Sequence, residues 1–136
     1  MISSDLANRI ALRSLTAGED ELVDAIGRAL GPSQQKEIAQ AAGLKLPSPA
    51  ELGRRVLQTV LPPVRFGICS KLNYCKNREH YDTAVKVATL VGEHVADAVG
   101  KSYGVPEGAG EGAALVIEVS ASILKKGLNN LCECPE

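Results

Sequence analysis

RFGICSKLNYCKNREHYD, residues 65–82, is the stretch that decides how this chain folds, because it gathers residue types that are rare elsewhere in the sequence. It holds Cys69 and Cys75, two of the four cysteines, and three of the four aromatic residues. The other two cysteines, Cys132 and Cys134, lie close to the C-terminal end. An even number of cysteines clustered at two places favours joint use over four unrelated thiols. We therefore expect the C-terminal tail to return to residues 65–82.

Three kinds of chemistry fit the cysteine pattern, which reads C-x5-C, 56 intervening residues and C-x-C. A zinc site would bind all four thiolates tetrahedrally, although the usual C-x2-4-C spacing differs from both halves of the pattern. Two disulfides would tie the tail back, for example by joining Cys69 to Cys134 and Cys75 to Cys132, and sequence alone does not choose among three connectivities. Four free thiols beside basic residues would respond to redox state or metal. All three alternatives stay open at this point.

The composition predicts a helical core. Of the 136 residues 45% are hydrophobic, but only 3% are aromatic and none is Trp. A core of Leu, Val, Ile and Ala suits closely packed helices better than β-sandwiches, whose strands favour aromatic and β-branched residues. We expect an all-α fold, in which residues 1–136 form a single compact domain of five to six helices.

We expect this domain to have two helical parts. Short helices in residues 1–63 would pack on a helical hairpin formed by residues 77–126. The cysteine and aromatic stretch, residues 64–82, would lie between them, and the cysteine tail, residues 127–136, would be tied back to that stretch.

Capping signals predict where the helices begin and end. Ser48-Pro49-Ala50-Glu51 is a capping box, and the helix that it begins should stop at Pro62-Pro63. Apolar residues at helical spacing, with Ser3 or Ser4, Ser33 and Asn77 as caps and Gly43 as a stop, predict further helices. They are expected over residues 4–15, 19–30, 33–42, 77–99 and 111–126, with a glycine-rich connector over residues 100–112.

The two histidines are predicted to lie far apart. His80 and His94 would both belong to the helix over residues 77–99, fourteen residues from each other. Fourteen residues of helix rise by about 21 Å, too far for one metal ion. We expect no shared site.

Residues 34–44, QQKEIAQAAGL, followed by a capped helix that carries Arg54 and Arg55, resemble the core of a helix-turn-helix. The resemblance covers about 25 residues and implies DNA binding. The connection LKLPSP is longer than the usual turn, and the alternative is two consecutive core helices. The residues expected to contact nucleic acid or another anion are Lys36, Lys45, Arg54, Arg55, Arg65 and Lys71.

Charge is unevenly distributed along a chain whose net charge is only −1. Residues 52–78 contain six basic and no acidic residues, whereas the tail CECPE is acidic. A basic segment can bind nucleic acid, but complementarity with the acidic tail is the simpler explanation. The charge pattern therefore agrees with a tail that folds back.

No catalytic motif is present: the sequence has no G-x-S-x-G, H-E-x-x-H or P-loop pattern. A Cys75–His80 pair could supply a nucleophile and a base, but their spacing is unspecific. We expect a protein that is not an enzyme and has no cofactor, apart from zinc if the cysteines bind it.

The leading functional prediction is a helical interaction module, an adaptor or regulator, that binds a protein partner or self-associates. One alternative is a DNA-binding regulator with metal- or redox-responsive cysteines. A third is a secreted, disulfide-stapled effector or toxin-like protein. The N-terminus has no apolar signal core and the most apolar run, residues 113–124, is shorter than the roughly 20 residues of a membrane span. We therefore expect a cytoplasmic location, or a secreted one if the cysteines form disulfides.

Overall fold

The computed structural model describes residues 2–104 and 110–135, and within these ranges it is helical and contains no strand. The all-α prediction is confirmed. A π-helical turn, η1 (Phe66–Lys71), and two short 3₁₀ turns, η2 (Tyr74–Lys76) and η3 (Arg78–His80), follow α4. The α-helices are α1 (Ser4–Thr16), α2 (Glu19–Arg28), α3 (Pro32–Ala42), α4 (Pro49–Arg65), α5 (Ala84–Tyr103), α6 (Gly110–Lys126) and α7 (Leu128–Leu131).

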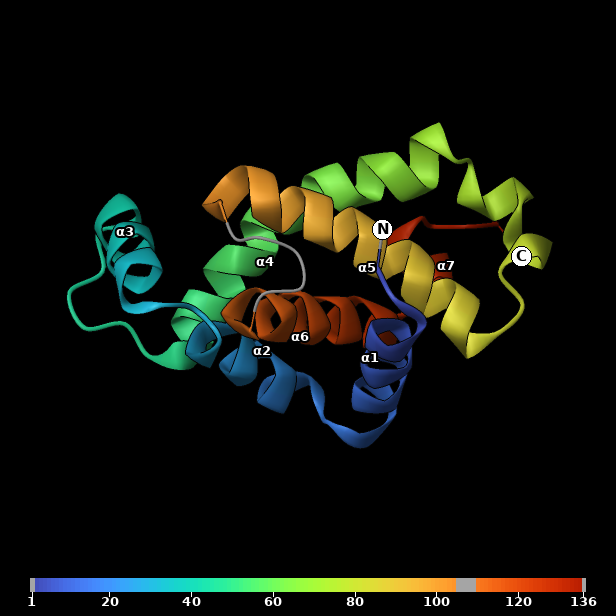
Figure 1. Ribbon diagram of the computed structural model, residues 1–136. Helices are drawn as coiled ribbons and strands as arrows, with labels where there is room; N and C mark the ends of the chain where they lie inside the picture. Colours follow the sequence, from blue (N-terminus) through green and yellow to red (C-terminus); the bar gives the residue numbers. More distant parts are fainter. Residues whose placement is uncertain (1, 105–109, 136) are drawn as a thin grey trace.

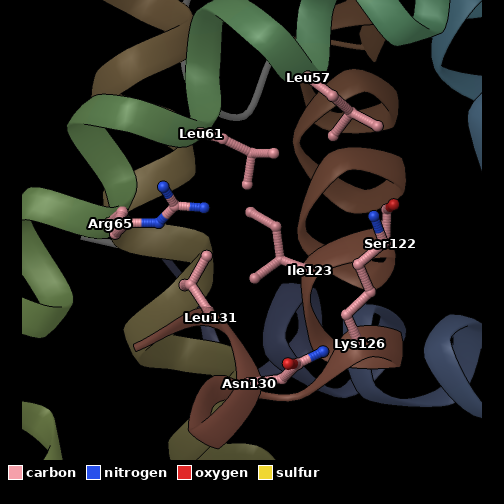
Figure 2. A pocket seen from close by; sticks show the side chains of 8 residues that line it. All are labelled: Leu57, Leu61, Arg65, Ser122, Ile123, Lys126, Asn130 and Leu131. Carbon is pink, nitrogen blue, oxygen red and sulfur yellow. The ribbon is translucent and has the colours of Figure 1, made fainter. Parts of the chain in front are cut away.

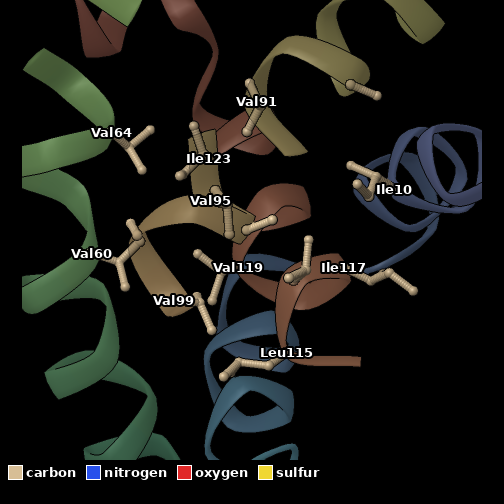
Figure 3. Packing of buried hydrophobic residues seen from close by; sticks show 14 of the residues in the cluster. Ile10, Val60, Val64, Val91, Val95, Val99, Leu115, Ile117, Val119 and Ile123 are labelled. Atoms are coloured by element: carbon tan, nitrogen blue, oxygen red, sulfur yellow. The ribbon is translucent and has the colours of Figure 1, made fainter. Parts of the chain in front are cut away.

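Helix α6 lies in the middle of the molecule, and α1, α2 and α5 pack around it (Figure 1). Helix α4 packs against α2 and α5, whereas α3 stands at one end of the molecule. The antiparallel pair α5 and α6 is the predicted hairpin, and the shorter helices pack on it. Figure 3 shows valines of α4 and α5 meeting the aliphatic side chains of α6, among them Val60, Val95, Val99, Leu115 and Val119.

Local hydrogen bonds fix the helix ends, and the predicted caps Ser3 and Ser48 are confirmed, whereas α3 begins at Pro32 after Gly31 and not at Ser33. The hydroxyl of Ser3 accepts from the backbone N–H of Leu6 and begins α1. Ser48 and Glu51 form the reciprocal capping box of α4. Gly43, at φ +71°, ends α3 in the left-handed region that glycine tolerates best.

The prediction that α4 stops at Pro62-Pro63 is wrong, because the helix continues to Arg65 and into η1. The two prolines remove the N–H groups that would bond the carbonyls of Gln58 and Thr59. Those residues are exposed, so water can satisfy their carbonyls. The helix face opposite the prolines is buried along its length, as shown by Val60, Val64 and Ile68. Burial of this face outweighs the loss of two backbone hydrogen bonds.

The helix predicted from Asn77 begins only at Ala84, with the hydroxyl of Thr83 as its cap. Asn77 caps no helix, because its side-chain amide donates to the carbonyls of Leu72 and Asn73 and closes a turn. At its other end α5 runs through Gly100 to Tyr103. Residues 105–109 of the predicted glycine-rich connector lie outside the described residues.

Helices α2 and α4 cross at two glycines. A Cβ atom on Gly53 would overlap the carbonyl oxygen of Val23, and one on Gly27 would overlap that of Pro49. The absence of side chains therefore lets the two backbones touch, which brings α4 close enough to α2 to share the core. No described helix is both long and apolar enough to cross a membrane.

Candidate functional site

Two disulfides bind the tail to residues 65–82. Cys69 is bonded to Cys132 and Cys75 to Cys134, with Cα–Cα distances of 5.2 and 5.3 Å. The predicted return of the tail is confirmed. In Figure 1 the red C-terminal segment extends to the yellow-green segment. This pairing differs from the example given above, which joined Cys69 to Cys134 and Cys75 to Cys132.

The disulfides decide between the three alternatives for the cysteines. No cysteine is free, so the reactive-thiol alternative is wrong. A sulfur in a disulfide is not the thiolate that zinc requires, so the four-cysteine zinc site is not supported. Cys75 cannot act as a nucleophile beside His80 for the same reason.

The tail is also held by main-chain contacts. The Arg78 guanidinium donates from Nη2 to the carbonyl oxygen of Pro135 at 3.3 Å and from Nε to that of Cys75 at 3.1 Å. Among the described residues Glu133 forms no ion pair with the basic stretch. The Arg78 cation therefore contacts the tail through the carbonyl group of Pro135, and Glu133 does not supply the predicted charge complementarity.

The returning tail closes one side of a groove, which we call the tail groove. It lies between α4, α6 and α7, encloses about 240 Å³, and is shown in Figure 2. Its lining residues are Leu57, Leu61 and Arg65 of α4, Ser122, Ile123 and Lys126 of α6, and Asn130 and Leu131 of α7.

Four of the eight residues that line the tail groove are aliphatic, and two others are cations. Leu61 and Leu131 face each other across the groove, with Ile123 between them (Figure 2). The guanidinium of Arg65 points into the space between the two leucines (Figure 2). Among the described residues neither Arg65 nor Lys126 forms an ion pair. The arrangement is suited to a ligand that is apolar at one end and anionic at the other.

The local structure at the end of α6 positions α7, which forms one wall of the tail groove. Gly127 has φ +90°, which favours glycine, and it separates Lys126 from the short helix α7. Leu128 is buried in the main core and anchors α7. Leu131 then reaches the groove immediately before Cys132, whose disulfide to Cys69 fixes the chain. The wall therefore depends on both core packing and the disulfide.

A second hollow, of about 530 Å³, is lined by both histidines. The prediction that His80 and His94 lie about 21 Å apart assumed that both belong to one helix. This is wrong, because His80 lies in η3, before α5 begins, and both histidines line the same hollow. His94 places Nδ1 2.9 Å from the carbonyl oxygen of Leu90, to which it donates. No group of three His, Cys, Asp or Glu residues in the described part of the chain could hold a metal ion.

The six predicted anion-contact residues are spread over α3, the loop after it, α4 and η1. All are exposed: Lys36 is on α3, Lys45 on the loop after it, Arg54 and Arg55 on the first half of α4, and Lys71 at the end of η1. Arg65 lies ten residues beyond Arg55 on α4, a rise of about 15 Å. Only Arg65 lines the tail groove. DNA binding by the six residues stays a prediction.

Sequence reasoning missed most of the tail groove. Leu61, Ile123, Lys126 and Leu131 lie in three separate segments and read as ordinary core or helix-end residues. The only signal was the position of Leu131 next to Cys132, once the tail is known to return. No protein-family model, curated protein or solved structure matches this chain.

Proposed function

We propose that this chain is a non-enzymatic interaction module that binds a segment of a protein partner in the tail groove. The observation that carries the proposal is the combination of an aliphatic slot with two cations, Arg65 and Lys126, that no described carboxylate pairs. An apolar slot with cations at its edge matches the usual composition of binding pockets, which are mostly apolar and have a few polar groups that orient the ligand.

The chemistry of the slot favours a segment that presents an apolar side chain next to a carboxylate. Arg65 can bind a carboxylate through two parallel hydrogen bonds, and its aliphatic stem adds to the apolar wall. Arginine is also enriched among residues that dominate the binding energy of protein interfaces. Leu61 and Leu131 would supply the apolar contact.

The disulfides support a preorganised site. Because Cys132 is bonded to Cys69, the wall formed by α7 is in place before a partner arrives, which reduces the entropy lost on binding. Disulfides persist in oxidising compartments. We propose that the module works there rather than in the reducing cytosol.

The test is selection from random peptides with the oxidised protein as bait. Two libraries are needed, one fused through the peptide C-terminus and one with that terminus free. We expect enrichment of peptides with an aliphatic residue beside a carboxylate. Binding should fall at least tenfold in the Arg65→Ala/Lys126→Ala variant.

The matched control is Arg54→Ala/Arg55→Ala, which removes two exposed cations of the same helix outside the tail groove. It should retain binding. Failure to enrich any peptide, or equal binding to both double variants, would contradict the proposal. Circular dichroism establishes that each variant is folded.

A further inference from the structure

We infer that the element captured by the tail groove is the free C-terminus of a partner chain, with an aliphatic last residue. Its side chain would pack on the aliphatic lining residues Leu57, Leu61 and Ile123, and its α-carboxylate would face the cations Arg65 and Lys126. This inference rests on the proposed function and specifies which part of a partner the groove recognises.

The size of the groove sets the first limit on the ligand. An engineered cavity of about 150 Å³ holds a benzene molecule, and pockets for drug-sized ligands enclose about 300 to 1,000 Å³. At about 240 Å³ the tail groove lies between these values. It therefore has room for one aliphatic side chain and a group of carboxylate size.

The placement of charge sets the second limit. Arg65 and Lys126 line the same small space as Leu61, Ile123 and Leu131. A matching ligand should therefore carry an apolar group and a negative charge close together, and a single residue that has both is the most compact solution. An internal residue of a peptide supplies only one of these. A C-terminal Leu, Ile or Val supplies both, because its carboxylate is attached to the same Cα as its side chain.

Polar groups beside the cations complete the match. Asn130 and Ser122 line the groove together with Lys126. An amide N–H and a hydroxyl both donate to carboxylate oxygens. Arg65 on α4 and Lys126 on α6 lie on opposite sides of the groove (Figure 2). A carboxylate between them would be approached by donors from two helices.

The experiment compares labelled octapeptides by fluorescence anisotropy with the oxidised protein. One peptide ends in Leu with a free carboxylate, a second is the same peptide with a C-terminal amide, and a third carries Gly-Ser after the Leu. We expect the free-acid peptide to bind at least tenfold more tightly than the other two. In Arg65→Ala this difference should shrink, while Arg54→Ala should preserve it.

The other possible results of this experiment separate the C-terminal inference from the proposed function. Equal binding of the acid and amide peptides would overturn the C-terminal inference and leave the proposed function standing. The same holds if all three fail to bind while internal library peptides bind in a manner that depends on Arg65. If neither the octapeptides nor any library peptide binds, both proposals are overturned.

Discussion

The imidazole ring of His94 lies against the backbone of Gly67, so that a Cβ atom at position 67 would come within 2.5 Å of the ring Cδ2 atom. This contact joins the start of η1 to the middle of α5. Because η1 carries Cys69, the position of the first disulfide depends on how closely Gly67 and His94 approach.

Substitution Gly67→Ala should destabilise the fold. The added methyl group would overpack the contact with His94, and overpacking typically lowers the free energy of unfolding by about 1 to 3 kcal/mol. Urea unfolding followed by circular dichroism measures the change. Gly18→Ala is the control, since a Cβ there would meet no atom within 4 Å; equal losses in the two variants would contradict this account of Gly67.

The two disulfides should stabilise the fold non-additively. They close loops with sequence separations of 63 and 59 residues between the same two segments. Once one bond is formed, the second closes only a small ring. In the chain-entropy model, removal of either pair alone lowers the free energy of unfolding by about 2 to 3 kcal/mol, whereas removal of both lowers it by about 6 to 7 kcal/mol.

The variants Cys69→Ala/Cys132→Ala, Cys75→Ala/Cys134→Ala and the fourfold variant form the necessary cycle. Urea unfolding gives the three free-energy changes. A fourfold loss equal to the sum of the two paired losses would contradict the shared-ring explanation.

The ion pair between Arg13 and Glu118 should contribute to stability, since it joins α1 to α6. The Arg13 Nε atom donates to both Glu118 oxygens at 2.9 and 3.1 Å, and both side chains are partly buried. The hydrogen bond to Glu118 raises the pKa of Arg13. We expect Glu118→Gln to lower the free energy of unfolding by about 1 to 2 kcal/mol.

The control for this pair is Asp82→Asn, which breaks the exposed ion pair with Lys86. Exposed pairs contribute little because water screens them. Thermal unfolding should therefore shift clearly in Glu118→Gln and hardly in Asp82→Asn. Equal shifts would show that burial of the Arg13–Glu118 pair has no special importance.

Stability should fall at alkaline pH because of two tyrosines. Burial raises the pKa of Tyr74 above its ordinary value, and burial also raises that of Tyr103, against a lowering by a hydrogen bond from Thr59. The unfolded chain then loses these protons first, near pH 10, so the free energy of unfolding decreases as the pH rises above that value. Below about pH 9 this contribution is constant.

Urea unfolding between pH 8 and pH 11 measures the slope. Tyr74→Phe/Tyr103→Phe should flatten it, since phenylalanine does not titrate. A slope unchanged by the two substitutions would contradict the assignment.

Several helix caps and the return of the tail could be predicted from the sequence, whereas the course of the chain through Pro62 and the pairing of the cysteines could not. Ser3, Gly43 and the Ser48–Glu51 box act through hydrogen bonds within one helical turn, which residue types alone identify. The continuation of α4 through Pro62 depends on burial of its opposite face, which no local pattern reveals. The local pattern shows only the two prolines, which usually end a helix.

The cysteine cluster was identifiable, but its pairing was not. Four cysteines at two places indicate a joint role, and the return of the tail follows from that. The choice of Cys132 as the partner of Cys69 depends on the path of α7, which is anchored by Leu128 in the core. The tail groove depends on the same path, so only Arg65 among its residues was predicted as an anion contact.

The most direct test of the central proposal is a methyl NMR titration of the oxidised protein with a peptide selected by the libraries. The proposal predicts that the largest chemical-shift changes occur at the methyl groups of Leu57, Leu61, Ile123 and Leu131, which line the tail groove. Shift changes centred on Leu72, Val85 and Leu90, in the hollow lined by His80 and His94, would place binding elsewhere and contradict it.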